Sequence, residues 1–324
     1  MENRRPGEPS GFRRSNSLIQ QVRFIRNADI IWVRVRPEHT TDQERAIIDN
    51  RLRPFRNRIP IINDISIFDN YDCKDKAFSI WKEHGIGCPD FLSFNVDNHT
   101  YNHFNVVEKV SKFLKKHEKI LLRTNNETAA NGMYVLGPSE TKKDINAVLF
   151  NLEMRCKELV KNRKNTRIIA TEFIKSQHSD GYIDLYRAHI LLGKIISYYV
   201  VTNKKDIFHN VDMNEECLER FIQLNNSLCN KIEHLDSQII FASKVLGCNL
   251  GAVEFFLIGD KPIFIELNPM WGGHASTFGF GDSKVQNYLD VNKRELISQI
   301  PNIYYWLDYP NYYKNLFELI NSSF

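Results

Sequence analysis

The sequence contains no run of about 18 apolar residues, which is the length that a membrane-spanning helix requires. Its longest apolar stretch, 190–201, is interrupted by Lys194. No apolar segment follows Arg4 and Arg5 either, as it would in a secretory signal peptide. We therefore expect no transmembrane segment and no membrane partner.

The six cysteines include no CxxC pair, so the spacing of a zinc site or of a small disulfide scaffold is missing. An even count permits disulfides. Scattered cysteines in a chain of this size are more typical of reduced, buried thiols, which predicts a cytoplasmic protein.

A concentrated basic stripe is missing as well. The net charge is only +4, and four arginines (Arg4, Arg5, Arg13 and Arg14) lie in the first fourteen residues, so the folded body is close to neutral. Nucleic-acid-binding domains usually cluster Lys and Arg on one face, so we expect no nucleic-acid partner. No Ser-His-Asp or Cys-His arrangement is recognisable, so no covalent side-chain nucleophile is expected.

What is present is an ordinary globular composition, 42% hydrophobic, which provides apolar material for a core. A length of 324 residues favours two or three subdomains. Residues 1–26 are predicted to form a flexible basic tail, because they begin with Pro, Gly, Ser and Arg rather than core-forming residues. A transit peptide is the alternative, since 11–27 has no acid, but Glu2 and Glu8 argue against it.

Hydrophobic periodicity predicts a mixed order of strands and helices. The first elements form a small β-α-β unit, with strands at 29–36 and 59–62 around a helix at 41–53. A helix at 72–84 precedes Gly85, which fits a C-terminal cap, and the segment around Pro89 should be extended. The later elements are a helix at 104–117, strands at 119–124 and 133–136, a helix at 142–161, a strand at 167–174, two strands within 182–202, helices at 213–229 and 231–245, strands at 248–258 and 262–268, and helices within 284–324.

Two glutamates lie in the apolar strands of the last hairpin, Glu254 in AVEFFLI and Glu266 in IFIELN. A carboxylate among such neighbours costs several kcal/mol unless it meets a cation. If the turn has an odd number of residues, such as 259–261, Glu254 stands opposite Glu266, and Asn268 shares their face. Two carboxylates and an amide oxygen are ligands suited to Mg²⁺ or Mn²⁺. The alternative is that each glutamate pairs with Lys or Arg.

An acid on one strand followed by Glu-x-Asn on the next resembles the ATP-grasp superfamily, and the resemblance covers roughly residues 60–285. It implies that Glu254, Glu266 and Asn268 hold Mg²⁺ (or Mn²⁺) against the phosphates of ATP, with Asn268 also contacting the nucleotide. It also implies an α+β (α/β) fold of ATP-grasp architecture: a short N-terminal β-α-β unit, a lid subdomain and a C-terminal subdomain that holds the metal-binding antiparallel hairpin.

The resemblance extends to basic residues. Lys76, ahead of Gly85 and Pro89, fills the position of a phosphate-contacting and catalytic lysine; the alternative is a solvated helix lysine. Arg123 ends the first lid strand, where the family usually has Lys followed by a loop richer in glycine than NNETAANG. Arg187 matches an arginine near the γ-phosphate, and Asn210 could line the same cavity.

The segment between lid and C-terminal subdomain resembles the adenine-binding strand of the family, with Glu172, Phe173 and Ile174 as the contacts. The alternative is an exposed strand end. The resemblance thus divides the chain into a tail (1–26), a reduced N-terminal unit (27–70), a helical segment (71–118), a lid (119–174), a C-terminal subdomain (175–285) and a helical aromatic extension (286–324).

The activity that the resemblance implies is carboxylate–amine ligation: ATP phosphorylates a carboxylate, and an amine displaces phosphate. The alternatives are a kinase with a hydroxyl acceptor and a base such as Asp184, His189 or His274, or a nucleotide-binding scaffold without turnover. Substrates would be small-molecule or peptide carboxylates and amines, and a homodimer is possible. Substrate contacts could come from the loop 272–281 and from the C-terminal aromatics, whose alternative role is core packing (Tyr304, Tyr305, Trp306, Tyr309, Tyr312 and Tyr313).

Overall fold

The structure is a computed structural model that describes residues 28–35, 40–127, 132–208, 212–269, 282–299 and 309–324. The tail, the loop 272–281, Asn210, His274 and the aromatic residues 304–306 lie outside these ranges. The side chains of 309–313 are not described either.

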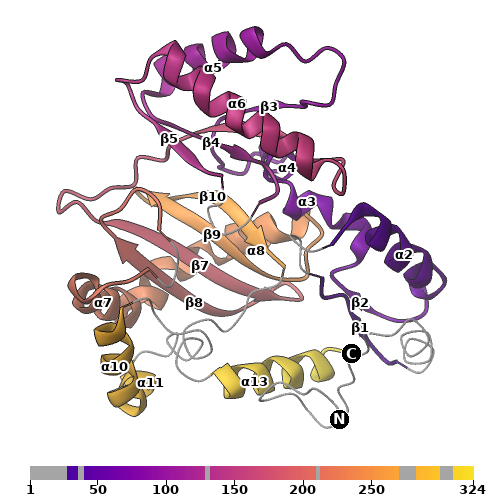
Figure 1. Cartoon of the computed structure of the whole chain (residues 1–324). Coiled ribbons are helices and arrows are strands. Elements are labelled where there is room, and N and C mark those ends of the chain that lie inside the picture. Colours follow the sequence, from indigo (N-terminus) through magenta and orange to yellow (C-terminus); the bar gives the residue numbers. More distant parts are fainter. Residues whose placement is uncertain (1–27, 36–39, 128–131, 209–211, 270–281, 300–308) are drawn as a thin grey trace.

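The described elements alternate between strands and helices, which confirms the mixed α+β class (Figure 1). They are β1 (Ile31–Trp32), α2 (Asp42–Leu52), η2 (Arg53–Phe55), β2 (Ile61–Ile62), η3 (Ile65–Ile67), α3 (Asp69–Asp72), α4 (Lys74–Glu83), β3 (Phe91–Phe94), α5 (His103–His117), β4 (Ile120–Thr124), β5 (Tyr134–Leu136), α6 (Lys142–Leu159), β6 (Ile168–Glu172), β7 (Ile183–Leu191), β8 (Lys194–Asn203), α7 (Glu215–Ile232), η4 (Glu233–Leu235), α8 (Asp236–Val245), β9 (Leu250–Ile258), β10 (Lys261–Asn268), α10 (Ser283–Val291), α11 (Lys293–Gln299) and α13 (Tyr309–Ser322).

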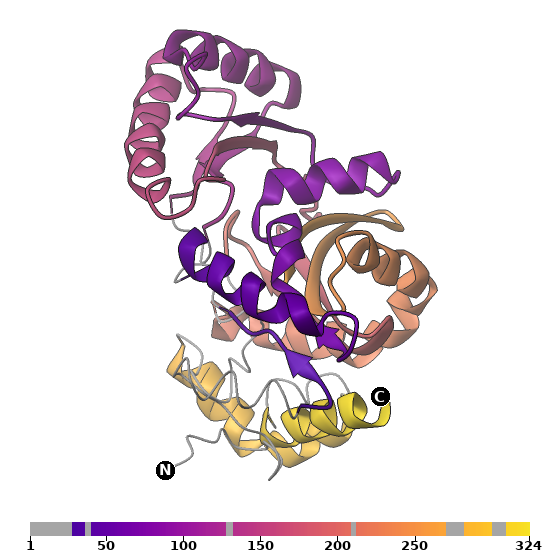
Figure 2. The same cartoon turned by 90° about the vertical axis from the view of Figure 1, so that its right-hand side faces the viewer.

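The N-terminal unit is the predicted β-α-β arrangement, because β1 and β2 pair in parallel on either side of α2. Thr41 caps α2 in a reciprocal bond with Glu44, which satisfies free N–H groups of the first turn. The strand expected at 29–36 is shorter and covers only Ile31–Trp32. In Figure 2 this unit lies between the lid above and the C-terminal helices below.

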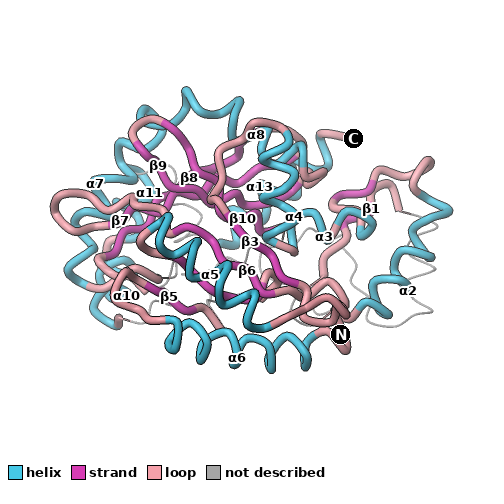
Figure 3. Tube along the Cα trace, turned by 90° about the horizontal axis from the view of Figure 1, so that it is seen from above, coloured by secondary structure: helices cyan, strands magenta, loops and turns pink. Residues whose placement is uncertain are grey.

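The lid sheet has the order β3-β6-β4-β5 and is antiparallel throughout. We expected β4, β5, α6 and β6 here, but not β3, which pairs with β6 from within the segment 71–118. The helix α5 of that segment also packs beside α6 on one face of the sheet, away from the C-terminal sheet (Figures 1 and 3). The lid sheet therefore begins before residue 119, while the division into domains stays a prediction.

The C-terminal sheet has the order β10-β9-β7-β8. One of its faces is filled by a row of buried aromatic rings, Tyr186, Phe255 and Phe264, and Trp81 of α4 packs against Phe264. Trp81 also donates a hydrogen bond from Nε1 to the Ala242 carbonyl of α8 at 2.8 Å. These contacts fix α4, and the residues at its start, against the sheet.

No described helix is long and apolar enough to cross a membrane. The five described cysteines that the structure places (Cys73, Cys88, Cys156, Cys217 and Cys248) form no disulfide with one another.

The residue Gly87 covers the open edge of β10. Its carbonyl accepts a hydrogen bond from the Phe264 N–H at 2.9 Å, and a Cβ at Gly87 would lie 2.8 Å from the Pro262 carbonyl oxygen. That contact is with backbone, so a side chain at residue 87 would push this segment away from β10.

We predict that Gly87→Ala destabilises the protein by about 1–3 kcal/mol, the usual cost of overpacking. Gly137→Ala is the matched control, because its Cβ would meet only the Glu140 side chain, at an ordinary 3.5 Å. Urea unfolding of the two variants measures the difference. Equal midpoints would contradict the close approach of Gly87 to β10.

Candidate functional site

The pairing of the two glutamates depends on a β-bulge. The turn between β9 and β10 has two residues, Gly259 and Asp260, where we expected an odd number. A two-residue turn alone would place Glu254 opposite Ile265, but a bulge at Ile265 shifts the register by one residue, so that Glu254 stands opposite Glu266. The predicted pairing is confirmed, and its cause is the bulge rather than the turn.

A row of polar side chains crosses three strands at this level. Glu254 pairs with Glu266 of β10 on one side and with Arg187 of β7 on the other. Arg187 forms an ion pair with Glu254, and its guanidinium lies 5.5 Å from the Tyr199 ring. Asn268 donates from Nδ2 to Glu254 Oε1 at 3.2 Å, so it shares the face of the two carboxylates as expected.

The lysine that reaches this row is Lys74, not Lys76. Lys74 Nζ lies 2.8 Å from Glu266 Oε1, and its side chain is only 7% exposed. Lys76 is exposed. The physical reason is the helical phase of α4: Lys74 precedes Ala77, Phe78 and Trp81 on the buried face, while Lys76 points to the opposite side.

Arg123 lies beside the same carboxylate. Its Nη2 donates to the Glu127 carbonyl at 2.6 Å, and Lys74 Nζ donates to the same oxygen at 3.3 Å. Burial lowers the pKa of Lys74 and of Arg123, and Glu266 opposes that change in both. For Glu266, burial would raise the pKa, but Lys74 and Arg123 outweigh it and hold the pKa below its usual value. Glu266 is therefore ionised between two cations.

Glu127 is fixed by a second set of bonds that sequence reasoning missed. Its carboxylate accepts from Thr124 Oγ1 at 2.7 Å and from Arg155 Nε at 2.5 Å. Arg155 also lies against Gly132, where a Cβ would come within 3.2 Å of it. Arg155 of α6 thus contacts both ends of the polar loop between β4 and β5.

The predicted adenine contact Glu172 points away from the site. Along β6, Ile168 and Ala170 pack under α5 and α6, and alternation places Glu172 on that same face. Its Oε2 accepts from the Asp90 N–H at 2.7 Å and lies 3.9 Å from His117 Nδ1. The side chain of Glu172 is therefore not available to a nucleotide on the face of Arg123.

Phe173 and Ile174 follow β6 and are half-buried. The Phe173 ring lies 4.2 Å from Lys119 Nζ, and Lys119 also pairs with Asp206 at 2.6 Å, which links the lid to the segment after β8. Leu121 is half-buried between Lys119 and Arg123 on the same face of β4.

Two of the proposed bases, Asp184 and His189, are buried. Asp184 is buried on the opposite face of the sheet, where Arg220 and Thr202 donate to it. His189 is on the face of Arg187 but wholly buried, with Nδ1 2.6 Å from Ser197 Oγ. Neither is exposed to a substrate beside Arg187.

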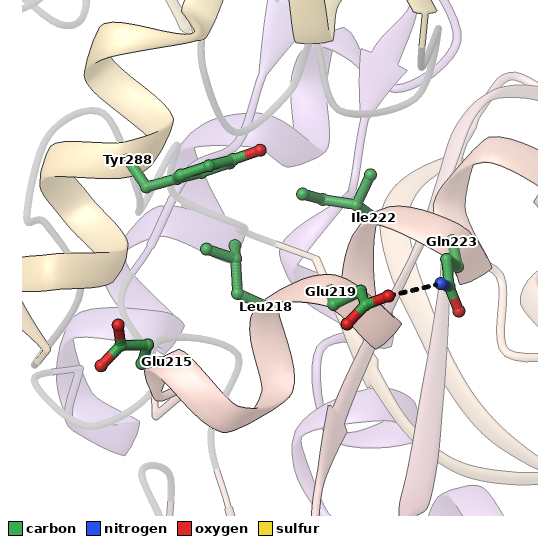
Figure 4. Close-up of a pocket in the computed structure, with 6 residues that line it drawn as sticks. All are labelled: Glu215, Leu218, Glu219, Ile222, Gln223 and Tyr288. Carbon is green, nitrogen blue, oxygen red and sulfur yellow. Dashed lines mark hydrogen bonds between the residues drawn. The ribbon is translucent and has the colours of Figure 1, made fainter.

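Other candidate sites among the described residues are weaker. The groups Asp90–His117–Glu172 and Asp69–Asp72–Cys73 could each bring three ligand atoms together, but Lys82 and Lys116 already bind Asp90. A pocket of about 340 Å³ between α7 and α10 is lined by Glu215, Leu218, Glu219, Ile222, Gln223 and Tyr288 (Figure 4). It contains none of the predicted site residues.

The described carboxylates, amide and cations of this site fit a divalent cation bound to a polyphosphate. Without a ligand, each glutamate is paired with a cation, Glu266 with Lys74 and Glu254 with Arg187, which is the arrangement of the alternative interpretation. The charges of these four groups cancel. The same carboxylate oxygens and Asn268 suit Mg²⁺, and the same cations suit phosphate oxygens.

No protein-family model matches the chain, and no curated protein matches it. Among solved structures, the D-alanine–D-alanine ligase from Bacillus anthracis superposes with a TM-score of 0.51 at 11% identity, over 92% of this chain and 86% of that chain. The same ligase complexed with ATP superposes with a TM-score of 0.51 at 13% identity, over 92% of this chain and 84% of that chain. The ATP-grasp ligase PsnB, complexed with a precursor variant, Mg and ADP, superposes with a TM-score of 0.44 at 12% identity, over 79% of this chain and 68% of that chain. The likeness to the first two shows that this chain shares the fold of those ligases.

We predict that Lys74→Met destabilises the protein by about 2–3 kcal/mol because it removes the ion-pair partner of Glu266 and leaves only Arg123 beside that carboxylate. The cost is below that of a wholly buried pair, since the Glu266 side chain is 24% exposed. Lys76→Met should change the unfolding free energy by less than about 0.5 kcal/mol, as exposed substitutions do. Chemical denaturation measures both. Adding Glu266→Gln to Lys74→Met should restore much of the loss, and no recovery would show that the two side chains are not coupled.

Proposed function

We propose that this protein is an ATP-dependent carboxylate–amine ligase that uses Mg²⁺ or Mn²⁺. The observation that carries the proposal is the row Glu266–Glu254–Arg187 with Asn268 beside it, facing Lys74 and Arg123 within an ATP-grasp fold. The fold alone does not define an activity. The row supplies the charges that a metal and a triphosphate require.

In the ligand-bound state, Glu254, Glu266 and Asn268 would hold the metal. A divalent cation supplies charge neutralisation at the phosphate oxygens. Lys74 and Arg187 would then exchange their carboxylate partners for phosphate oxygens, and Arg123, which donates to the Glu127 carbonyl, would add a third cation beside them. The exchange leaves no group unpaired, because each cation and each carboxylate gains an opposite charge as it loses one.

The nucleobase would lie along β4, away from the cations. Leu121 and Phe173 of the lid offer a half-buried apolar wall there. Phe256 follows Glu254 by two residues on β9, and Leu185 precedes Arg187 by two residues on β7, so each shares the face of that charged residue. Both Phe256 and Leu185 are half-buried. Glu172 points to the other face, the Phe173 N–H donates to the Lys119 carbonyl, and the Ile174 carbonyl accepts from Ser176, so the Phe173 carbonyl and the Ile174 N–H would be the backbone groups that meet the base.

The reaction begins with attack of a substrate carboxylate oxygen on the γ-phosphorus. The bond from that phosphorus to the bridging oxygen breaks, and ADP leaves with its electron pair. An amine then attacks the acyl carbon, the bond from carbon to the phosphate oxygen breaks, and phosphate leaves while the amine nitrogen loses a proton. Positioned cations next to the phosphates lower the barrier of the first step.

A hydroxyl acceptor would require a base beside the γ-phosphate, whereas a carboxylate acceptor is already ionised at pH 7. Of the three residues considered for that role, His274 lies outside the described residues, and the two that are described do not fit, since Asp184 lies on the other face and His189 is wholly buried. This observation favours the ligase over the kinase. The substrates, the cytoplasmic location and a homodimer stay predictions.

We predict that a non-hydrolysable ATP analogue and Mg²⁺ together raise the melting temperature. Binding at 100 times the dissociation constant stabilises by about 2.7 kcal/mol. Glu254→Gln should remove most of the shift, since it deletes one ligand charge. Glu172→Gln is the control and should keep it, because that side chain lies behind the lid sheet. A full shift in Glu254→Gln would exclude the metal site.

Turnover is tested with pools of carboxylates and amines, ATP and Mg²⁺. A ligase releases ADP and inorganic phosphate only when both substrates are present, and mass spectrometry then identifies the amide. A phosphorylated product without free phosphate would support the kinase instead. Binding without turnover under any pool would support the nucleotide-binding scaffold.

A further inference from the structure

Asn63, at the end of β2, has an unusual backbone and a buried side chain. Its φ is +54°, in the left-handed region that Asn tolerates better than most residues. The residue is only 2% exposed. Its N–H donates to Asn249 Oδ1 at 2.8 Å, and Asn249 Nδ2 donates back to the Ile61 carbonyl at 3.4 Å. The N-terminal unit and the start of β9 are therefore joined in both directions.

The Asn63 side chain connects the two strands that carry the carboxylates. Its Nδ2 donates to the Leu250 carbonyl at 2.6 Å and to the Pro269 carbonyl at 3.2 Å. Its Oδ1 accepts from the Leu250 N–H at 3.1 Å and from the Asn249 N–H at 3.3 Å. Leu250 is the first residue of β9, and Pro269 directly follows Asn268. One amide thus fixes the beginning of one strand to the end of the other.

The space around this amide is tight. A Cβ at Gly251 would lie 2.9 Å from Cys248 Sγ and 3.2 Å from the Asn268 carbonyl oxygen. Cys248 Sγ in turn lies 3.5 Å from Asn63 Oδ1. The backbone of Asn268 therefore has little freedom to shift relative to β9.

We propose that Asn63 is a positioning residue for the metal site, because it fixes the backbone next to Asn268 relative to β9 and so holds the Asn268 amide beside Glu254. The inference rests on the proposed function. It also assigns a role to the short N-terminal unit, which braces the carboxylate hairpin from the side opposite the lid. A shift of the Asn268 backbone would move its side-chain oxygen relative to Glu254, while Lys74, Arg123 and Arg187 would stay in place.

Only an amide satisfies this position. Two of its partners are carbonyl oxygens and two are N–H groups, so the side chain must offer two donors on one atom and an acceptor on the other. Asp has nearly the same shape but would face the Leu250 and Pro269 carbonyls with a carboxylate oxygen. Asn63→Asp therefore replaces two hydrogen bonds, those to the Leu250 and Pro269 carbonyls, with repulsive contacts between oxygens, and it changes the side-chain volume little.

The test compares Asn63→Asp with Asn70→Asp in the full chain. Asn70 is a charge-matched control, since its Nδ2 also bridges to a distant carbonyl, that of Leu246 at 3.3 Å, but not to β9 or β10. Affinity for a non-hydrolysable ATP analogue is measured with Mn²⁺ and with EDTA, and the electron paramagnetic resonance spectrum of bound Mn²⁺ reports the ligand geometry. Asn63→Gly keeps the backbone conformation and replaces Asn63→Asp if the latter does not fold.

We expect Asn63→Asp to weaken nucleotide binding about tenfold with Mn²⁺ and less than twofold in EDTA, with an altered Mn²⁺ spectrum. Asn70→Asp should match the wild type in all three measurements. Equal losses with Mn²⁺ and in EDTA would overturn the inference, because they indicate general damage rather than a displaced metal ligand. An unchanged Mn²⁺ affinity would overturn it too. A wild type that binds no nucleotide with Mn²⁺ would instead overturn the proposed function, and the inference with it.

Discussion

The rest of the site depends on two carboxylates that lie opposite each other on neighbouring strands. Glu254 and Glu266 would repel each other without an intervening positive charge. The structure places a cation on each: Arg187 arrives from the next strand, and Lys74 from the start of a helix held by Trp81. The chain must therefore bring four separate elements, β9, β10, β7 and the start of α4, to one row of the sheet. The lid adds a fifth contribution, since Arg123 lowers the pKa of Glu266 further.

Much of this row could be predicted from the sequence, because the alternation of strand side chains ties Asn268 to Glu266. The pairing of Glu266 with Glu254 was predicted for an incorrect reason. A two-residue turn needs an extra residue to restore the register, and Ile265 is that residue. No residue type in IFIELN marks a bulge, since Ile is ordinary in a strand. Register across a hairpin is fixed by the backbone, so the sequence pattern leaves it undetermined by one residue.

The positions of two other predicted site residues, Lys76 and Glu172, could have been inferred from periodicity. Lys74 shares its helical face with Ala77, Phe78 and Trp81, which identifies it as the inward lysine ahead of Lys76. Glu172 alternates with Ile168 and Ala170, which pack under helices, so its side chain had to point outward. The role of β3 could not be predicted in the same way. Its pairing with β6 joins residues about 80 positions apart, and such partners are not encoded in local pattern.

The pairing of Glu266 with Lys74 and of Glu254 with Arg187 has a thermodynamic consequence. Metal alone would take both carboxylates and leave Lys74 and Arg187 without partners, while nucleotide alone would take the cations and leave two facing carboxylates unpaired. Each partial state keeps desolvated charge of one sign, which costs several kcal/mol. Under the proposed function, metal and nucleotide together would avoid both costs, so each would strengthen the binding of the other by the same factor. Such a site would favour the full metal–nucleotide complex over either component.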